Sequence, residues 1–337
     1  MRQWSLRRTA SGFIETGGST AAILALALGA AVATTARAQS YPKAPIQVVI
    51  AAAPGDAGDL VARAVGASLA AQLGATLTPV NRPGAGGSVA TQSVLNARRD
   101  GYTILLATNS AVTFRPAMDP QDVGYDVGRD LVPLGLVARN PTVLVVRADA
   151  PYRDLRELVA SSRAKTGAVH VGSAGAGSSG DLCLQVLAAA TGAEPVHVPF
   201  KGASPALTAL LGAHLEGAFL ALGTLHGPLH NGTVRAIVSS SQIADLPSVP
   251  TLSGAGYGAA LFDIWYAFFA PAGVGPEVSR ALVPAIAQAA ADPAVVAKYR
   301  HLGIQPNYLS PAGLLAEIED ERRRLERFVR PSGAAPK

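Results

Sequence analysis

One supersecondary unit occurs twice in this chain of 337 residues, and it limits the folds that the sequence can adopt. The segments 48–85 and 169–203 each contain a strand-like run, a glycine-rich loop, a Gly-Asp-Leu tripeptide, a helical stretch, a glycine and a Pro-Val strand. The tripeptides are residues 58–60 and 180–182. Two copies of one unit indicate two lobes of like topology, although ordinary strand-helix-strand succession could also produce so loose a repeat.

Short runs rich in Val and Ile alternate with longer helical stretches from Ile46 onward, and this alternation predicts an α/β fold with parallel strands. The predicted strands are 46–51, 77–80, 103–107, 142–147, 169–172, 196–199, 235–239 and 264–270. The predicted helices are 60–73, 88–97, 155–164, 182–191, 205–211, 276–290 and 311–329. In such sheets, ligands bind beyond the carboxyl ends of the strands. Two lobes that face each other would therefore make a cleft.

Four loops that follow a strand and open a helix are candidates for the walls of this cleft: 54–59, 82–88, 173–181 and 200–205. Small residues let the main chain approach a ligand, and the partial positive charge of a helix N-terminus favours a carboxylate or a phosphate. The alternative is a set of ordinary turns, because capping alone explains the residue types Asp59, Ser88, Asp181 and Ser204.

The first 38 residues have the layout of a cleaved secretory signal peptide. Arg2, Arg7 and Arg8 precede the apolar run 21–33, and the small-x-small site 36–38 follows it. The run is too short to cross a bilayer, which takes ~20 residues. We expect export to the periplasm by the general secretory route, although the paired arginines also suit the twin-arginine route. Cleavage would leave Trp265 as the only tryptophan.

Charge and motifs argue against nucleic acid, nucleotide and zinc binding. Residues 1–38 hold four Arg and one Glu, so their removal lowers the net charge from +5 to +2 and leaves no basic domain for nucleic acid. Residues 175–180 match G-x-G-x-x-G, but Glu194 precedes the next strand instead of ending it, as a ribose-binding acid would. His226 and His230 are four residues apart, but the Gly, Pro and Asn residues around them predict a loop.

The single cysteine, Cys183, excludes a disulfide framework and Cys-rich metal sites. Flanked by two leucines, it is expected to be a small buried residue rather than a reactive thiol. The sequence also lacks the G-x-S-x-G elbow of hydrolases. We therefore expect no catalytic residue, no metal and no cofactor.

Several stretches together resemble one family, the substrate-binding proteins of tripartite tricarboxylate transporters, called the Bug family. The resemblance runs from Tyr41 to about Val329. Its most specific motif is Asn-Arg-Pro-Gly-Ala-Gly-Gly at 81–87. The other matching stretches are 41–46, 100–103, 197–202, 246–251, Trp265 and 270–273.

The resemblance implies a type II periplasmic binding fold, in which two lobes joined by hinge strands close on a small carboxylate and deliver it to a membrane permease. The hinge crossings would be 142–147 and 264–270. Domain 1 would then comprise 39–139 and 264–337, and domain 2 would comprise 140–263. A carboxylate, amino acid or keto acid would be the ligand, and the protein would be a monomer that catalyses nothing.

The family's ligand site maps onto two loops of this sequence, with two additions just past a strand end. The implied residues are Pro54, Gly55, Asp56, Ala57, Gly58, Asp59, Ser173, Gly177, Ser178 and Asp181, with Thr108 and Asn109 as additions. Asp56 stands where the family commonly has Gly, Asp181 where it has His, and Ala209 where Asp is usual. Either the two acids turn away as caps, or the ligand also carries a positive or neutral donor group.

Two other functions stay open from the sequence. The chain could be an extracytoplasmic sensor that delivers its ligand to a receptor rather than a permease, or a hydrolase on a two-lobed scaffold. Trp265 would begin the hinge strand that returns to the first lobe, so its emission is expected to report closure, unless it is a rigid core residue.

Overall fold

Both copies of the repeated unit form the elements that the sequence predicts. The computed structural model describes residues 41–118 and 120–328, so the predicted signal peptide lies outside the described residues. The first copy consists of β1 (Ile46–Ile50), α2 (Ala57–Leu73) and β2 (Leu77–Asn81), and the second of β6 (His170–Ser173), α8 (Ser179–Thr191) and β7 (Val196–Pro199). Gly74 and Gly192 end the two helices in the left-handed conformation that glycine adopts without strain.

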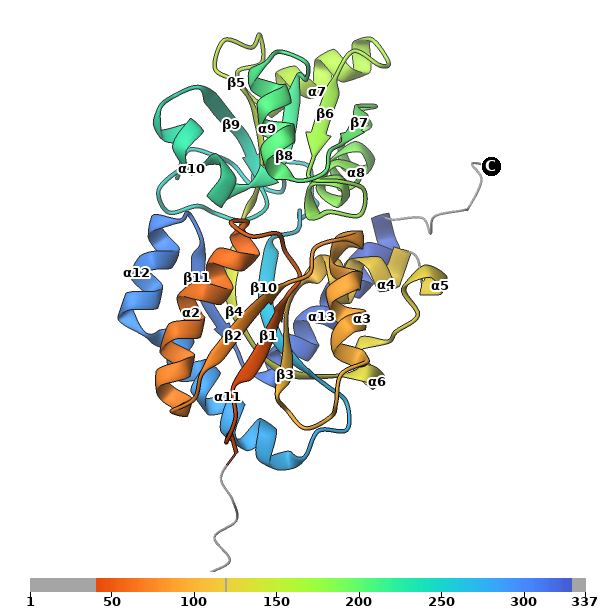
Figure 1. Cartoon of the computed structure of the whole chain (residues 1–337). Coiled ribbons are helices and arrows are strands. Elements are labelled where there is room, and N and C mark those ends of the chain that lie inside the picture. Colours follow the sequence, from red (N-terminus) through yellow and green to blue (C-terminus); the bar gives the residue numbers. More distant parts are fainter. Residues whose placement is uncertain (1–40, 119, 329–337) are drawn as a thin grey trace, which may run out of the picture. The chain divides into compact units, whose positions relative to one another are not determined.

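The strands form two sheets, each of which contains one copy of the unit (Figure 1). The six-stranded sheet has the order β11-β4-β10-β3-β1-β2, and the five-stranded sheet has the order β7-β6-β8-β5-β9. The strands not yet given are β3 (Thr103–Thr108), β4 (Leu131–Asn140), β5 (Thr142–Arg147), β8 (Gly217–Ala221), β9 (Val234–Ser239), β10 (Ile264–Pro271) and β11 (Gln305–Leu309). The predicted parallel pairing holds within β1–β3 and β6–β8, while β4, β5, β9, β10 and β11 pair antiparallel, so both sheets are mixed.

Helices cover both faces of each sheet. In the six-stranded sheet α2 packs with α11 (Pro276–Ala291) and α12 (Pro293–His301), whereas α3 (Ser88–Leu95) and α13 (Pro311–Phe328) join the core of the other face (Figure 1). The five-stranded sheet is covered by α7 (Leu155–Ala164), α8, α9 (Ala203–Leu211) and α10 (Leu222–His230). Short helical segments follow β3: η3 (Ser110–Phe114, a π-helix), α4 (Arg115–Met118), α5 (Pro120–Val123) and α6 (Val127–Asp130); η2 (Ala85–Gly87) precedes α3.

The alternation of side chains along β5 explains why the five-stranded sheet is apolar on both faces. Val143 and Val145 belong to the core cluster beneath α9 and α10, and Leu144 and Val146 belong to the cluster beneath α7 and α8. Such a strand is buried on both sides and therefore appears in the sequence as a continuous apolar run.

The chain passes between the sheets at two places. Pro141 alone separates β4 in one sheet from β5 in the other, and residues 240–263 lead from β9 back to β10. Helix α13 also joins the two cores, because Leu314 and Ile318 pack in the six-stranded sheet while Leu325 packs in the cluster of the other sheet. Three segments therefore connect the two sheets.

One local prediction is wrong. The residues around His226 and His230 form helix α10, with Pro228 inside it, instead of a loop. Burial of Leu222 and Leu225 against the sheet stabilises this short helix despite the proline. In the described residues no helix is both long enough and apolar enough to cross a membrane.

Candidate functional site

The loops that open α2 and α8 have the same hydrogen-bonded geometry. In the first loop the Gly55 N–H donates to Asp59 Oδ2 over 2.9 Å, and in the second the Gly177 N–H donates to Asp181 Oδ2 over 2.8 Å. In both, a carboxylate in the first turn of a helix holds a glycine of its own loop, four residues earlier. The two copies of the repeat therefore place equivalent loops at the ends of equivalent strands.

The remaining partners of the two carboxylates are also equivalent by position in the repeat. Asp59 accepts bonds from Arg63 Nε at 2.9 Å and Asn81 Nδ2 at 3.0 Å. Asp181 accepts one from Gln185 Nε2 at 3.0 Å, and His197 Nδ1 lies 3.4 Å from it. Arg63 and Gln185 come four residues after the carboxylates, while Asn81 and His197 follow the two Pro-Val pairs.

Both carboxylates are occupied by hydrogen bonds within the protein. Asp59 is 3% exposed and Asp181 is 6% exposed. Burial alone would raise the pKa of Asp59, but hydrogen bonds from Arg63, Gly55 and Asn81 together hold it below the ordinary value. The structure thus places both acids within the protein, where they support their loops.

Ser178 and Ser173 form a short chain of hydroxyl groups at the second loop. Ser178 is the N-cap of α8, and its Oγ accepts a bond from the Asp181 N–H at 3.3 Å. The same hydroxyl donates to Ser173 Oγ over 3.4 Å, and Ser173 Oγ lies 2.7 Å from His197 Nε2. Both ring nitrogens of His197 therefore support predicted site residues, although the sequence analysis assigned His197 no role.

Residues from the segment after β3 reach the second loop. Ser110 Oγ donates a hydrogen bond to the Gly177 carbonyl oxygen over 2.9 Å. The Arg115 side chain lies between two glycines, because a Cβ on Gly86 would be 3.0 Å from its Cγ and a Cβ on Gly177 would be 3.2 Å from its Cδ. Loops 82–88 and 173–181 are thereby brought together. Neither Ser110 nor Arg115 carries a sequence motif that would have predicted this.

The other predicted loops lie in two different surroundings. Loop 200–205 sits against the second loop, since the Phe200 N–H donates to the Ser173 carbonyl and the Gly202 N–H to the Ala174 carbonyl. Loop 54–59 lies on Tyr266 of β10, where a Cβ on Gly58 would be 3.6 Å from the ring. Among the described residues, no hydrogen bond joins loop 54–59 to loop 173–181.

The structure buries Asn109 at the end of β3, where it bonds to the segment before β10 and to α13. Asn109 is fully buried, and its Nδ2 donates to the Asp263 carbonyl at 2.8 Å and to Glu321 Oε1 at 2.9 Å. Thr108, its neighbour, ends β3 in register with Tyr266. Thr108 therefore belongs to β3, and Asn109 joins the end of that strand to α13 and to the segment before β10.

A single hydroxyl links the two crossings of the chain. Ser240 Oγ accepts a hydrogen bond from the Thr142 N–H at 2.8 Å and donates one to Asp263 Oδ1 at 2.5 Å. Ser241 Oγ donates to the same carboxylate oxygen over 2.9 Å. Because Thr142 begins β5 and Asp263 precedes β10, Ser240 connects the two crossings of the chain by hydrogen bonds.

Trp265 begins this returning strand and is fully buried beside Glu321. In protein that starts at Gln39, we expect a bound ligand to shift its fluorescence emission in a saturable way, because closure moves the hinge around it. Small-angle scattering on the same samples should report compaction. A ligand that compacts the protein and leaves the emission unchanged would show that Trp265 is only a rigid core residue.

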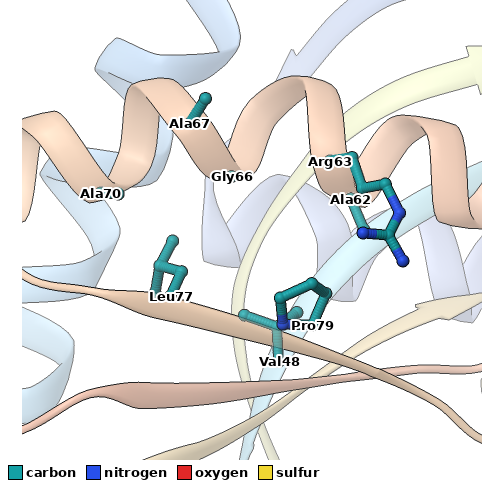
Figure 2. Close-up of a pocket in the computed structure, with 8 residues that line it drawn as sticks. All are labelled: Val48, Ala62, Arg63, Gly66, Ala67, Ala70, Leu77 and Pro79. Carbon is teal, nitrogen blue, oxygen red and sulfur yellow. The ribbon is translucent and has the colours of Figure 1, made fainter.

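Two surface pockets lie away from the four loops. One of about 310 Å³ lies between α2 and strands β1 and β2, with apolar Leu77 and Pro79 facing Gly66 and Ala67, and with Arg63 at its rim (Figure 2). The other, of about 430 Å³, lies beside α6 and α13. Neither is lined by a residue of the loops, and the first pocket sits behind the Arg63–Asp59 pair.

The described chain offers little for catalysis. Burial raises the pKa of the Cys183 thiol to about 12, and that thiol exchanges hydrogen bonds with the Phe262 backbone, so it is a structural residue. Within residues 41–118 and 120–328, no group of three His, Cys, Asp or Glu side chains is arranged to hold a metal ion. The loops offer backbone N–H groups and hydroxyls for hydrogen bonding, and they carry the exposed charged side chains of Asp56, Arg82 and Lys201.

Comparison with known proteins supports the two-lobed fold and the family resemblance. The family model described as tripartite tricarboxylate transporter family receptor, TctC, matches residues 61–333. BugT of Bordetella pertussis (strain Tohama I) is 32% identical over 307 residues, which cover 90% of this chain and 94% of BugT.

Two solved structures from Rhodopseudomonas palustris are similar to this chain. MatC, solved with bound malate, has a TM-score of 0.77 and 28% identity over 86% of this chain and 100% of MatC. A second protein, solved with adipate, has a TM-score of 0.79 and 25% identity over 86% of this chain and 97% of its own. These matches confirm the resemblance inferred from the motifs and the two-lobed α/β fold. The chain therefore belongs to the TctC family of solute-binding receptors, to which the Bug proteins are also related.

Proposed function

We propose that this protein is a periplasmic receptor that binds one small organic acid between its lobes and delivers it to the membrane permease of a tripartite transporter. The observation that carries the proposal is the pair of equivalent loops, in which Asp59 and Asp181 hold Gly55 and Gly177 at the starts of two long helices. Such loops present backbone N–H groups and the positive end of a helix dipole, which suit a carboxylate. The relatives solved with malate and adipate support this ligand class.

In this proposal each predicted residue has one of two tasks. Asp59, Asp181 and Asn109 are buried supports, while the loop residues 54–58 and Ser173, Gly177 and Ser178 line the ligand site. The N–H groups of Gly55 and Gly177 are already bonded to the two carboxylates, so these glycines shape their loops and do not donate those groups to the ligand. The lobes comprise 39–139 with 264–337 and 140–263, and they close about the crossings at Pro141 and Asp263. Residues 1–38 direct export. No catalytic step, cofactor or metal takes part, and one chain is sufficient for binding.

Replacement of Ser178 by alanine tests the site directly. Ser178→Ala should weaken carboxylate binding by about 1 kcal/mol, or by up to about 3 kcal/mol if the hydroxyl meets the ligand charge. Isothermal titration calorimetry against mono-, di- and tricarboxylates, keto acids and amino acids measures the change.

Ser310→Ala is the matched control, because Ser310 also accepts a bond from the N–H three residues later, and at the same 3.3 Å. It removes the same kind of helix cap far from the loops, so its ligand affinity should equal that of the wild type. Equal losses in both variants would assign the effect to capping. Folded protein that binds no member of the panel would contradict the proposed function.

A further inference from the structure

Asp56 is the acidic residue of the first loop that does not cap its helix. It occupies the N-cap position of α2 with extended backbone angles, φ −69° and ψ 162°, yet its carboxylate forms no cap hydrogen bond to α2, and its backbone partner is Ala53 in the loop before it. Ser178 holds the equivalent position in the second copy and does cap its helix. The Asp56 side chain is exposed, and it forms no ion pair with any described residue. Its carboxylate is therefore available to a ligand at this loop.

The negative charge of Asp56 is not balanced by an ion pair with any described residue. The neighbouring carboxylate of Asp59 is neutralised by Arg63, whose Nε lies 2.9 Å from both Asp59 oxygens. Partial burial raises the pKa of Asp56, a backbone hydrogen bond at Ala53 lowers it, and repulsion from Asp59 raises it further. A carboxylate in this position gains more from a cation than a carboxylate surrounded by water does.

Buried polar groups lie behind the same loop. Tyr266, 3% exposed, packs under Gly58, and its hydroxyl lies near Asp56 and the Asn140 amide. Asn140 is fully buried, and its Oδ1 accepts a bond from the Gly223 N–H at 3.2 Å while its amide interacts with the Tyr266 hydroxyl. Tyr299, beside Tyr266, buries a hydroxyl that has no hydrogen-bond partner in the described chain. An unsatisfied polar group at such depth indicates a missing polar neighbour, such as a ligand or a water molecule.

We propose that Asp56 makes this receptor selective for aminocarboxylates, acids that carry an ammonium group besides the carboxylate. The inference rests on the proposed function and specifies its substrate class. The ligand carboxylate takes the backbone N–H groups of the helix N-termini, and the ammonium group pairs with Asp56. A plain dicarboxylate would place its second negative charge near Asp56 and be repelled.

Matched ligand pairs isolate the ammonium group. Succinate with aspartate, glutarate with glutamate, and adipate with 2-aminoadipate each differ by one amino substituent. A charge-assisted hydrogen bond is about twice as strong as a neutral one, so the wild type should bind the amino member of at least one pair tenfold or more tighter. Calorimetry at low and high salt measures each affinity.

Asp56→Asn keeps the shape and hydrogen-bonding capacity of the side chain and removes its charge. We expect this variant to lose about tenfold in affinity for the amino acid and to gain or keep affinity for the unsubstituted acid. Asp292→Asn is the control, because Asp292 is the N-cap of α12 in the same lobe, where it accepts bonds from Ala294 N–H and Ser68 Oγ. The control should keep the wild-type preference.

The outcomes separate this inference from the proposed function. If the wild type binds the unsubstituted acids as tightly as their amino counterparts, and Asp56→Asn changes neither affinity, the inference is overturned while the proposed function stands. If no member of any pair, and no other acid of the wider panel, binds the folded protein, the proposed function fails and the inference fails with it.

Discussion

Glu321→Gln is expected to raise the free energy of unfolding at pH 8 by on the order of 3 kcal/mol. Glu321 is 1% exposed in the middle of α13, and burial raises its pKa to about 8 despite the hydrogen bond from Asn109. Its Oε2 has no hydrogen-bond partner in the described chain. One pKa unit corresponds to ~1.4 kcal/mol, so ionising this group within the fold is costly. Glutamine keeps the acceptor for Asn109 and carries no charge.

The sign of the pH dependence follows from the two states of the chain. Between the ordinary pKa of 4.5 and the folded value of about 8, the folded protein holds a proton on Glu321 that the unfolded chain releases. The stability that depends on this proton is fully present below pH 4.5, decreases as the pH rises, and is lost above about 8. Glu321→Gln should therefore flatten the profile of stability against pH in this window.

Urea denaturation from pH 5 to pH 9 measures the profile. The groups that face Glu321 are Asn109, Trp265, Glu317 and Arg324, so Trp265 fluorescence in the native protein should titrate in the same window and stop doing so in the variant. Glu319→Gln removes an exposed carboxylate from the same helix and serves as the control. Profiles of wild type, Glu319→Gln and Glu321→Gln that run parallel would contradict the prediction.

Local patterns predicted the repeated units well but missed β4, β8 and β11, and tertiary pairing explains why β4 and β11 were missed. Strand β4 includes Pro133 and Gly135, whose φ is +145°, and it pairs with β10 through register shifts, so no regular alternation marks it in the sequence. Strand β11 is a partly buried edge strand of mostly polar sequence. Both strands form because β10 and β4 offer hydrogen-bonding partners, and a single sequence does not display its partners.

The candidate site likewise contains some residues that the sequence pattern predicted and others that it did not. The repeat predicted where the two loops lie, and its alignment also contains the signal for their supports, because Asn81 and His197 occupy equivalent positions after the Pro-Val pairs. Ser110 and Arg115 had no such signal, since they reach the second loop from the π-helical segment η3 and the start of α4, whose course depends on packing. Only the structure could separate Asp181, which supports its loop, from Asp56, which is left available.

Gly180→Ala is expected to lower the free energy of unfolding by about 3 kcal/mol or more, because overpacking against rigid backbone forces the structure to shift. Gly180 lies in the first turn of α8, where that helix crosses β8. A Cβ at this position would lie 2.4 Å from the Phe219 carbonyl oxygen and 3.2 Å from Ser173 Cβ. Phe219 is paired with Leu144 in the centre of the five-stranded sheet, so its carbonyl cannot move without disturbing that pairing.

Gly66→Ala is the control for this prediction, because it introduces a Cβ into a helix without a steric clash. Gly66 lies in the middle of α2, and a Cβ there would meet no atom within 4 Å. Alanine exceeds glycine in helix propensity by about 1 kcal/mol, so Gly66→Ala should stabilise the protein by up to that amount. Gly180→Ala gains a similar propensity, so the difference in stability between the two variants in urea denaturation measures the cost of the clash. Equal stabilities of the two variants would show that α8 can withdraw from β8, and that the second loop is held less rigidly than its hydrogen bonds indicate.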